Sequence, residues 1–427
     1  MKKIGLFLIT GLVVLLSSSM VLVNAQVPWV EWSQTYGGIN NDGEFHLVYL
    51  IKVSDGGYII ASNTESFGAG GNDAWLIKVD SSGNIEWNQT YGGEKEDRAL
   101  SLILTTDGGY ALAGRTSSFG AGSNHNFWLV KTDEQGNMQW NQTYGGTNRA
   151  EALSVVQTSD GRYALAGEIW IDDGDQDFWL VKTDEYGNIQ WNRTYGGSSQ
   201  ETPFSLVETS DTGFVLAGRT RSFGIGDGDC WLVKVDSLGN MEWNKTYGGE
   251  ETDHIESIVQ TSDGGFALGA TTESFSPSWA IKTECWLIKT DNLGNMVWDK
   301  TYGGAENDWI HSLIITSDGG FAFVGETDSF GAGSRDFYLV KTDSDGNIEW
   351  SRTYGGTDLD FGQSLVETLD GGFVLAGNTK SFGVGGYDVW LIKTDSLGIP
   401  EFPSWIILPL FLTATLIVTL ARKKLRR

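Results

Sequence analysis

A seven-residue segment, Trp-Asn-Gln-Thr-Tyr-Gly-Gly at 140–146, occurs seven times along the chain with small changes. Its tyrosines are separated by 55, 53, 51, 52, 55 and 52 residues. They are Tyr36, Tyr91, Tyr144, Tyr195, Tyr247, Tyr302 and Tyr354. A repeat of about 50 residues with strand-like content is typical of solenoids, propellers and arrays, whose repeats stack into one body. The repeat therefore overrides the two or three domains that a chain of 427 residues would otherwise suggest.

Each repeat has the pattern of four short strands joined by tight turns. In residues 94–146, the apolar run 99–104 is followed by Asp107-Gly108. This is a strong hairpin signal, because glycine supplies the positive φ of a type I′ turn. Further strands are expected at 110–114, 127–131 and 138–144. Four strands in about 50 residues are typical of one propeller blade. We predict an all-β, seven-bladed β-propeller of four-stranded antiparallel blades over residues 27–398, and rank a parallel β-helix below it.

The two ends of the repeat array are complementary. The first copy of the motif begins at Trp32, with no blade before it, and the last repeat stops at Gly398 without its fourth strand. We therefore expect residues 30–36 to pair beside residues 388–393 and to complete the last blade. This pairing would close the ring with seven blades. Tryptophans repeated in every unit are interpreted as packing between blades and not as a sugar-binding surface.

Several segments resemble the SBBP (seven-bladed β-propeller) repeat family. They are the run 73–84, Tyr91-Gly92-Gly93, Asp107-Gly108-Gly109-Tyr110 and Ala113-Gly114. The resemblance extends over nearly all of residues 29–398 in seven ordered copies. It implies a propeller with an extracellular or envelope location, and it specifies no reaction.

The N-terminal 25 residues are typical of a secretory signal peptide. Lys2 and Lys3 precede an apolar run from residue 4 to 16, and Val23-Asn24-Ala25 fits a cleavage site before Gln26. An uncleaved N-terminal membrane anchor is the alternative. We predict a signal peptide at 1–25, and hence an exported protein.

The C-terminal end predicts a membrane anchor. Residues 405–421 carry no charge, and residues 422–427 form a basic tail that is expected to stay cytoplasmic. A buried core helix is the alternative, which the five terminal cations disfavour. The linker at 399–404 contains Pro400-Glu401-Phe402 and, with the helix and basic tail, resembles the PEF-CTERM sorting signal of archaeal surface proteins. That resemblance implies display on the cell surface, with the helix retained or cleaved by a sortase-like enzyme.

Charge and cysteine content limit the classes of partner. The formal net charge is −26, and it falls to about −33 without the two signal lysines and the five tail cations. Such an acidic surface repels phosphates, so we expect no nucleic-acid partner. The two cysteines, Cys230 and Cys285, each precede a repeated tryptophan and so occupy equivalent places in neighbouring blades. We expect two buried free thiols, because such places are too far apart for a disulfide.

An acidic residue lies six positions after the repeated tyrosine in every repeat except the third, which has Ala150. This acidic column is Asp42, Asp97, Glu201, Asp253, Asp308 and Asp360. At the start of the innermost strand it could form a ring around one mouth of the channel, where it could bind Ca²⁺ or steer a cationic ligand. The alternative is that each carboxylate caps the backbone of its own turn. We expect no other cofactor.

Two further columns carry chemistry that the repeat itself explains. Four N-glycosylation sequons begin at Asn88, Asn141, Asn192 and Asn244, and are as compatible with the requirements of the repeat as with glycosylation. A serine repeated at Ser101, Ser154, Ser205, Ser257, Ser312 and Ser364 is interpreted as a small residue where blades converge, since no Gly-x-Ser-x-Gly motif accompanies it. We predict no catalytic residue.

The expected function is that of a monomeric, non-catalytic binding or scaffold module displayed on the cell surface. Its ligand would be an unknown surface protein, a glycan or a cation, and the divergent loops 168–176 and 274–284 are candidate contact regions. The alternative is an extracellular propeller hydrolase or lyase with a site in the central channel. That alternative requires non-repeated polar residues to converge at one mouth of the channel.

Overall fold

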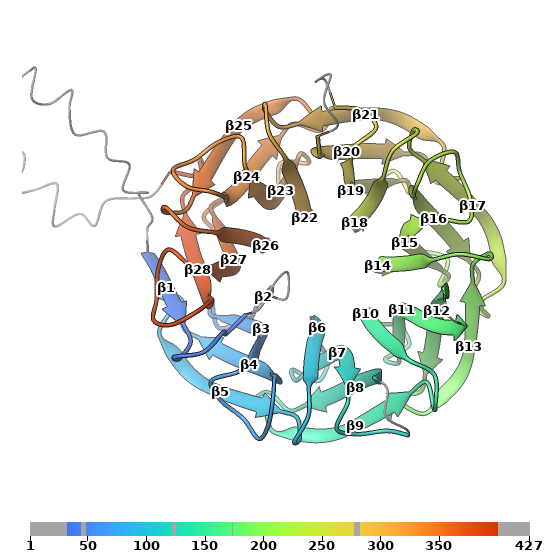
Figure 1. Cartoon of the computed structure of the whole chain (residues 1–427), viewed down its shortest axis with the longest axis horizontal. Helices are drawn as coiled ribbons and strands as arrows, with labels where there is room; N and C mark the ends of the chain where they lie inside the picture. Colours follow the sequence, from blue (N-terminus) through green and yellow to red (C-terminus); the bar gives the residue numbers. More distant parts are fainter. Residues whose placement is uncertain (1–31, 44–47, 122–124, 173, 277–281, 400–427) are drawn as a thin grey trace, which may run out of the picture.

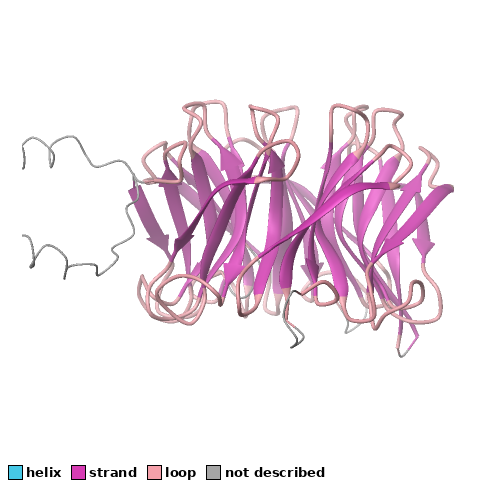
Figure 2. Cartoon of the chain, turned by 90° about the horizontal axis from the view of Figure 1, so that it is seen from above, coloured by secondary structure: helices cyan, strands magenta, loops and turns pink. Residues whose placement is uncertain are grey.

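A computed structural model describes residues 32–43, 48–121, 125–172, 174–276 and 282–399. Its strands form seven four-stranded antiparallel sheets arranged around a central channel (Figure 1). Seen from the side, the strands run between two rims of loops, and no helix occurs in the described part of the chain (Figure 2). The prediction of an all-β, seven-bladed propeller is confirmed.

Each blade holds four strands that follow one another from the channel outward. Blade 1 holds β2 (Tyr49–Lys52), β3 (Tyr58–Thr64), β4 (Asp73–Val79) and β5 (Ile85–Tyr91). Blade 2 holds β6 (Asp97–Leu104), β7 (Tyr110–Thr116), β8 (Asn126–Thr132) and β9 (Met138–Tyr144). Blade 3 holds β10 (Ala150–Gln157), β11 (Tyr163–Asp172), β12 (Asp175–Thr183) and β13 (Ile189–Tyr195). Blade 4 holds β14 (Glu201–Glu208), β15 (Phe214–Thr220), β16 (Asp229–Val235) and β17 (Met241–Tyr247).

The remaining three blades follow the same order. Blade 5 holds β18 (Asp253–Gln260), β19 (Phe266–Thr272), β20 (Glu284–Thr290) and β21 (Met296–Tyr302). Blade 6 holds β22 (Asp308–Ile315), β23 (Phe321–Thr327), β24 (Asp336–Thr342) and β25 (Ile348–Tyr354). Blade 7 holds β26 (Asp360–Glu367), β27 (Phe373–Thr379), β28 (Asp388–Thr394) and β1 (Trp32–Tyr36).

The ring closes through its first strand. Strand β1 pairs antiparallel with β28, in a register that runs from Trp32 opposite Lys393 to Tyr36 opposite Val389. The N-terminal segment therefore supplies the fourth strand that the last repeat lacks, as the sequence predicts. Backbone groups of β28 that would otherwise form an open sheet edge are thereby paired.

The repeated tyrosine joins neighbouring blades through a hydrogen bond. Each tyrosine hydroxyl donates a hydrogen bond to the carbonyl of a turn glycine in the next blade, as in Tyr91 to Gly136 (2.6 Å) and Tyr354 to Gly398 (2.8 Å). Gly136 has a φ of 77°. A Cβ on it would lie 2.6 Å from the ring of Trp87. The tryptophan and tyrosine of this motif therefore act together with a turn glycine of the next blade.

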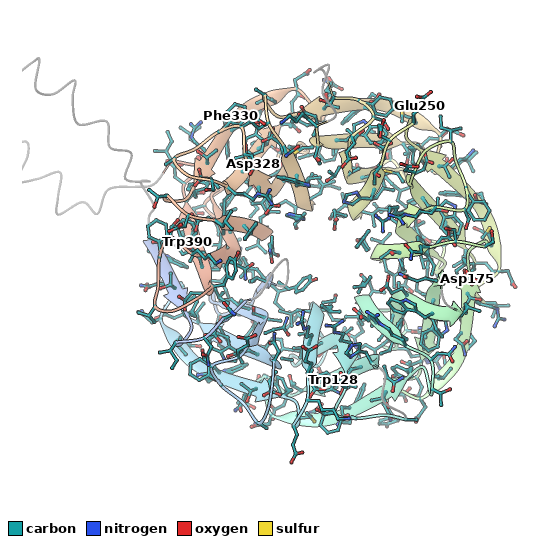
Figure 3. All side chains as sticks on the ribbon, viewed as in Figure 1. Trp128, Asp175, Glu250, Asp328, Phe330 and Trp390 are labelled. Carbon is teal, nitrogen blue, oxygen red and sulfur yellow. The ribbon has the colours of Figure 1, made fainter. Side chains whose placement is uncertain are left out.

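The core lies between blades. The second and third strands of most blades, such as β8 and β28, are buried along their whole length. Trp128 and Trp390 lie within the body of the ring and away from the channel (Figure 3). The repeated tryptophans thus pack between blades, as expected. Cys230 and Cys285 are buried free thiols, which confirms that prediction.

The predicted signal peptide (1–25), anchor (405–421) and basic tail (422–427) lie outside the described residues, as does all but the first residue of the linker 399–404. Across the described part of the chain, the structure contains no helix with the length and apolar character needed to cross a bilayer.

Candidate functional site in the central channel

The acidic column is buried at the blade junctions. Asp42, Asp97, Glu201, Asp253, Asp308 and Asp360 are all fully buried. Each accepts hydrogen bonds close to its own turn. Asp308, for example, accepts from the backbone N–H of Gly304 (2.8 Å) and the hydroxyl of Ser329 (2.7 Å). Glu201 accepts from the hydroxyl of Thr220 (2.9 Å). This is the capping arrangement that was the alternative to a channel ring.

The six acidic residues do not meet one another, but each faces a second carboxyl group from the preceding blade. The facing pairs are Asp388 and Asp42, Asp73 and Asp97, Asp177 and Glu201, Asp229 and Asp253, Glu284 and Asp308, and Asp336 and Asp360. At the junction of blades 4 and 5, a Cβ built on Gly248 would lie 2.5 Å from Asp229 Oδ1 and 2.6 Å from Asp253 Oδ2. Only glycine fits between the two carboxyl groups.

The junction between blades 2 and 3, where the acidic column is interrupted, supports this pairing. Where the acidic column has Ala150, the facing position holds Asn126 in place of a carboxylate. The Asn126 amide donates to the carbonyls of Gly146 (3.0 Å) and Asn148 (3.2 Å). Both members of the pair are thus neutral together, as expected if the charges interact.

Burial and mutual repulsion raise the pKa of the facing carboxyl groups. Burial, with Asp308 adding to it, raises the pKa of Glu284 to about 7. Burial and then Asp42 raise the pKa of Asp388 to about 6. Among the described residues, no three His, Cys, Asp or Glu side chains are placed to hold a metal ion. Calcium binding by the acidic column stays a prediction from the sequence.

The repeated serines connect adjacent innermost strands. The hydroxyl of Ser101 accepts from the backbone N–H of Val155 (3.2 Å), and that of Ser257 accepts from Leu313 (3.2 Å). Each of these serines follows a register shift in its own strand, as between Ala99 and Ser101. Their role in this structure is to join blades.

The four sequon asparagines each accept a hydrogen bond from a repeated tryptophan on the neighbouring strand. These contacts join Trp75 to Asn88 (3.2 Å), Trp128 to Asn141 (3.3 Å), Trp179 to Asn192 (3.2 Å) and Trp231 to Asn244 (3.3 Å). The amide oxygens therefore have a structural role, and glycosylation stays a prediction.

A pocket of about 470 Å³ lies in the central channel. Side chains from the innermost strands reach into this channel (Figure 3). Six of its lining residues occupy one column of the repeat, the position immediately before the repeated serine: Leu100, Leu153, Phe204, Glu256, His311 and Gln363. The pocket is therefore lined by the column that changes from blade to blade. Its size is in the range of small-molecule sites.

The pocket has an apolar wall and a polar wall. Blades 2, 3 and 4 contribute Leu100, Leu153 and Phe204, while Val48 and Tyr49 come from blade 1 and the residue before it. Blades 5, 6 and 7 contribute the polar wall, which is defined as His254, Glu256, Trp309, His311, Glu326, Arg335 and Gln363. This division gives one side of a ligand apolar contacts and the other side hydrogen bonds.

The polar wall contains two histidine–glutamate pairs. His254 Nε2 lies 3.0 Å from Glu256 Oε1, and His311 Nε2 lies 3.8 Å from Glu326 Oε1. Burial lowers the pKa of His311, but the neighbouring carboxylate of Glu326, together with the charge of Glu256, outweighs it and raises that pKa above its ordinary value. The charge state of this wall therefore depends on pH.

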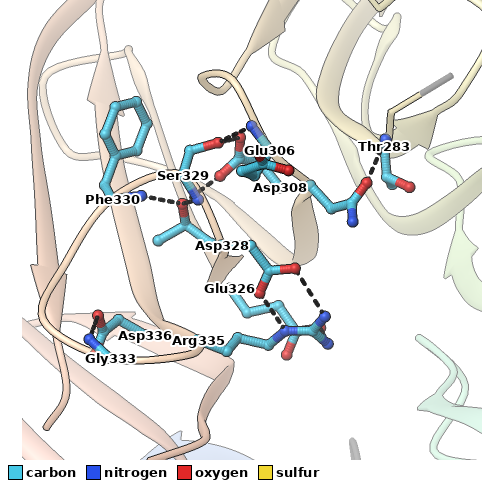
Figure 4. A network of polar contacts seen from close by, with 12 residues as sticks. Thr283, Glu306, Asp308, Glu326, Asp328, Ser329, Phe330, Gly333, Arg335 and Asp336 are labelled. Atoms are coloured by element: carbon cyan, nitrogen blue, oxygen red, sulfur yellow. Dashed lines mark hydrogen bonds and ion pairs between the residues drawn. The ribbon is translucent and has the colours of Figure 1, made fainter. Parts of the chain in front are cut away.

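Arg335 forms ion pairs with two carboxylates on one side of the polar wall. Its guanidinium group contacts Glu326 Oε1 (3.0 Å) and both carboxylate oxygens of Asp328 (2.9 and 3.1 Å), as Figure 4 shows. It also lies 4.0 Å above the ring of Trp309, within range of a cation–π interaction. Two carboxylates thus compensate one cation, which leaves the cluster negative.

The buried polar atoms of this wall that lack hydrogen-bond partners among the described residues include Glu326 Oε2 and Gln363 Nε2. These two residues are 1% and 7% exposed. Gln363 is held by its other amide atom, which accepts from the backbone N–H of Val48 (2.9 Å). Buried polar groups are rarely left unpaired, so these two atoms indicate that a further polar group belongs in this region.

Neither the repeated columns nor the divergent loops of the sequence indicated this site. In one of those loops, β11 and β12 extend to form a long hairpin, and Arg149, which precedes β10, lies 4.1 Å from the ring of Trp170 in β11. The other divergent loop contains residues outside the described ranges. The signal that could have identified the channel site was the loss of repetition in the column before the serine.

Comparisons with known proteins establish the fold and a distant relationship. Regulatory protein FlaEY from Caulobacter vibrioides is 22% identical over 295 residues, which are 61% of this chain and 29% of that protein. The chain thus spans less than a third of that relative's length. No family model matches the chain.

Solved structures resemble the chain in fold. Puromycin hydrolase has a TM-score of 0.52 at 12% identity, with 88% of this chain and 56% of that chain covered. The WD40 domain of Neurospora crassa Pan2 has a TM-score of 0.50 at 12% identity, with 85% of this chain and 92% of that domain covered. At this level of identity, the likeness extends to the propeller fold alone.

Proposed function

We propose that this protein is an exported, surface-displayed, membrane-anchored binding module that takes up a small ligand or the end of a larger one in its central channel, without catalysing a reaction. One observation carries the binding role. The blade scaffold repeats, whereas the column that lines the channel pocket diverges into an apolar wall and a polar wall. Pockets with this composition are typical ligand sites.

The chemistry of the rest of the repeat supports a binding role. The repeated tyrosine, serine and acidic columns are engaged in contacts between or within blades, as shown by Tyr91, Ser101 and Asp308. These repeated columns have structural partners, whereas the column before the serine varies from blade to blade and lines the pocket. The name of the distant relative, a regulatory protein, is compatible with action through binding. Surface display rests on the predicted signal peptide, anchor and family resemblance.

A channel hydrolase or lyase is the second candidate. The two histidine–glutamate pairs of the polar wall are the non-repeated polar residues that such an enzyme requires. Histidine and glutamate can both serve as a general acid or base. Binding is favoured because the repeated serines beside the channel accept hydrogen bonds from backbone N–H groups, as Ser257 does from Leu313. Within the described ranges, no histidine is placed against these serines to activate them.

The binding role is tested with the full chain in a mild nonionic detergent. A panel of small metabolites and short glycans is screened by ligand-observed NMR against the wild-type protein and two variants. Leu153→Trp fills the channel, whereas Leu293→Trp changes an exposed turn. We expect a panel member to bind the wild type and Leu293→Trp but not Leu153→Trp. Equal binding to all three proteins would contradict a channel site.

The same samples separate binding from catalysis, and intact cells test the location. A bound panel member recovered with unchanged mass supports binding, whereas its steady conversion supports the hydrolase or lyase candidate. Protease added to intact source cells should cleave the propeller if it is displayed. Full protection of the propeller under conditions that digest another surface protein would contradict display.

A further inference from the structure

We propose that the ligand of the channel carries a primary ammonium group, bound by the polar wall, with an apolar body against Leu100, Leu153 and Phe204. This inference rests on the proposed function and specifies the chemical class that the channel site takes. The partner class is a small organic cation or a lysine-like side chain with an apolar stem.

The first support is the charge of the polar wall. Glu256, Glu326 and Asp328 supply three carboxylates, and Arg335 is the cation that contacts two of them. With neutral histidines the cluster has a formal charge of about −2, which attracts cations, especially in a partly enclosed pocket. An anionic ligand would meet a guanidinium group already compensated by Glu326 and Asp328. The wall therefore selects positive charge.

The second support is the unpaired oxygen. Glu326 is 1% exposed, and its Oε2 has no hydrogen-bond partner among the described residues. A buried carboxylate oxygen is stabilised by a donor, and an ammonium group offers three. Glu256 lines the same pocket, and its side chain is 21% exposed, so it provides an acceptor that a ligand can reach. We place the ammonium group against Glu256, with Glu326 behind it as a source of negative charge and a second acceptor.

The third support comes from the opposite wall. Tyr49 lines this wall, and burial, followed by the charge of Glu256, raises its pKa. Tyr49 and Phe204 add aromatic surface beside Leu100 and Leu153. An alkyl or aryl stem buries apolar area there, while its ammonium end remains near the carboxylates. A small inorganic cation would leave this apolar wall unused.

The experiment is isothermal titration calorimetry of the full chain in nonionic detergent with n-butylamine and its uncharged analogue 1-butanol, each corrected for detergent alone. At pH 8 we expect butylamine to bind about tenfold or more tightly than butanol, since charge-assisted hydrogen bonds contribute about 1.5–3 kcal/mol. This comparison uses the wild-type protein and does not depend on the folding of any variant. Equal affinity for the two probes would overturn the inference.

Three variants locate the interaction. Glu256→Gln and Glu326→Gln keep the shape of the side chain and remove its charge, and each should weaken butylamine binding about tenfold or more. Glu168 is the matched control, because it occupies the position equivalent to Glu326 in blade 3. Its Oε2 already accepts from the Thr202 hydroxyl (3.1 Å), and Glu168→Gln should leave the affinity unchanged. Loss of affinity in the control alone would overturn the assignment.

The outcome distinguishes the inference from the proposed function. If a neutral panel member binds in the channel and is lost in Leu153→Trp, while butylamine does not bind, the ammonium inference is wrong and the channel site stands. If butylamine binds equally to the wild type and Leu153→Trp, the amine site lies elsewhere and the inference is likewise wrong. If every panel ligand is insensitive to Leu153→Trp, the proposed function fails as well.

Discussion

Replacing Glu284 by glutamine should stabilise the propeller near neutral pH. Glu284 faces Asp308 at the junction of blades 5 and 6, and it is 2% exposed. Its Oε1 has no hydrogen-bond partner among the described residues. A glutamine amide can donate to the facing carboxylate as a protonated acid would, without introducing a second negative charge. The substitution Glu284→Gln therefore copies the protonated state of the pair at every pH.

The magnitude follows from the pKa of Glu284. Burial and the charge of Asp308 raise it from 4.5 to about 7. A group whose folded pKa is raised contributes stability that is complete below its unfolded pKa and is lost as the pH rises through its folded pKa. At pH 7 this loss is about 3 kcal/mol, because each pKa unit corresponds to about 1.36 kcal/mol. Glu284→Gln should recover most of it at pH 7 and nothing at pH 4.

Differential scanning calorimetry at pH 4 and pH 7 measures this difference. For a domain of this size, 3 kcal/mol corresponds to a rise in Tm of about 4 °C. The control is Asp345→Asn, which removes one negative charge from an exposed turn and should change Tm little at either pH. A rise in Tm of equal size at pH 4 and pH 7, or a fall at pH 7, would refute the pairing of Glu284 with Asp308.

Four further measurements follow from the structure. The wild-type Tm should be highest near pH 4–5, because Glu284 and the other facing carboxyl groups with raised pKa lose their stabilising contribution above this range. Below it, the contribution of Asp318 disappears as the pH falls toward 2, because partial burial of Asp318 is outweighed by hydrogen bonds from Lys341 and Thr316, which lower its pKa to about 2. A Tm that is flat from pH 3 to pH 8 would contradict this. Thr212 has a φ of 65° and is the one non-glycine residue with positive φ among the described residues, so Thr212→Gly should stabilise by about 1 kcal/mol in chemical denaturation, and a destabilised variant would contradict strain at this turn. Deleting residues 27–36 removes β1 and should lower the Tm of the whole propeller in one cooperative transition, whereas an unchanged Tm would contradict closure by β1. Butylamine affinity should fall as the pH is lowered through the titration of His311, whose positive charge competes for Glu326 and Glu256, and an affinity that rises in acid would contradict this competition.

The fold could be predicted because the same pattern of strands and turns occurs in seven copies along the sequence. Seven copies of the tyrosine motif define the blades, and the complementary ends at Trp32 and Gly398 define how they close. What could not be read from the motif was its partner. The tyrosine hydroxyl binds a glycine carbonyl about 45 residues away, and this contact depends on how two blades pack.

The acidic column shows a partial success of the same reasoning. Its position at the start of the innermost strands was predicted, and capping of its own turn was one of the two interpretations. The facing carboxylates were not predicted, because they come from a different blade. A signal was present in the sequence. Ala150 interrupts the acidic column in the same junction where Asn126 replaces the facing carboxylate. Two columns that change together indicate contact, whereas one column taken alone does not.

The channel site was missed for a related reason. The column before the repeated serine has no single chemical character. It contains Leu100, Leu153, Phe204, Glu256, His311 and Gln363. Its variation is the property that distinguishes it. The position of Arg335 was beyond prediction, because its side chain is oriented by Trp309 and Asp328 through contacts that exist only after the blade has folded.

The channel site is tested most directly by a crystal structure of the protein grown with n-butylamine. We predict that the amine lies in the channel pocket, with its nitrogen within hydrogen-bond distance of the Glu256 carboxylate and its alkyl chain against Leu100, Leu153 and Phe204. A channel that contains only water, with the amine elsewhere on the protein, would contradict this account. So would an amine whose nitrogen lies at the apolar wall, away from Glu256 and Glu326.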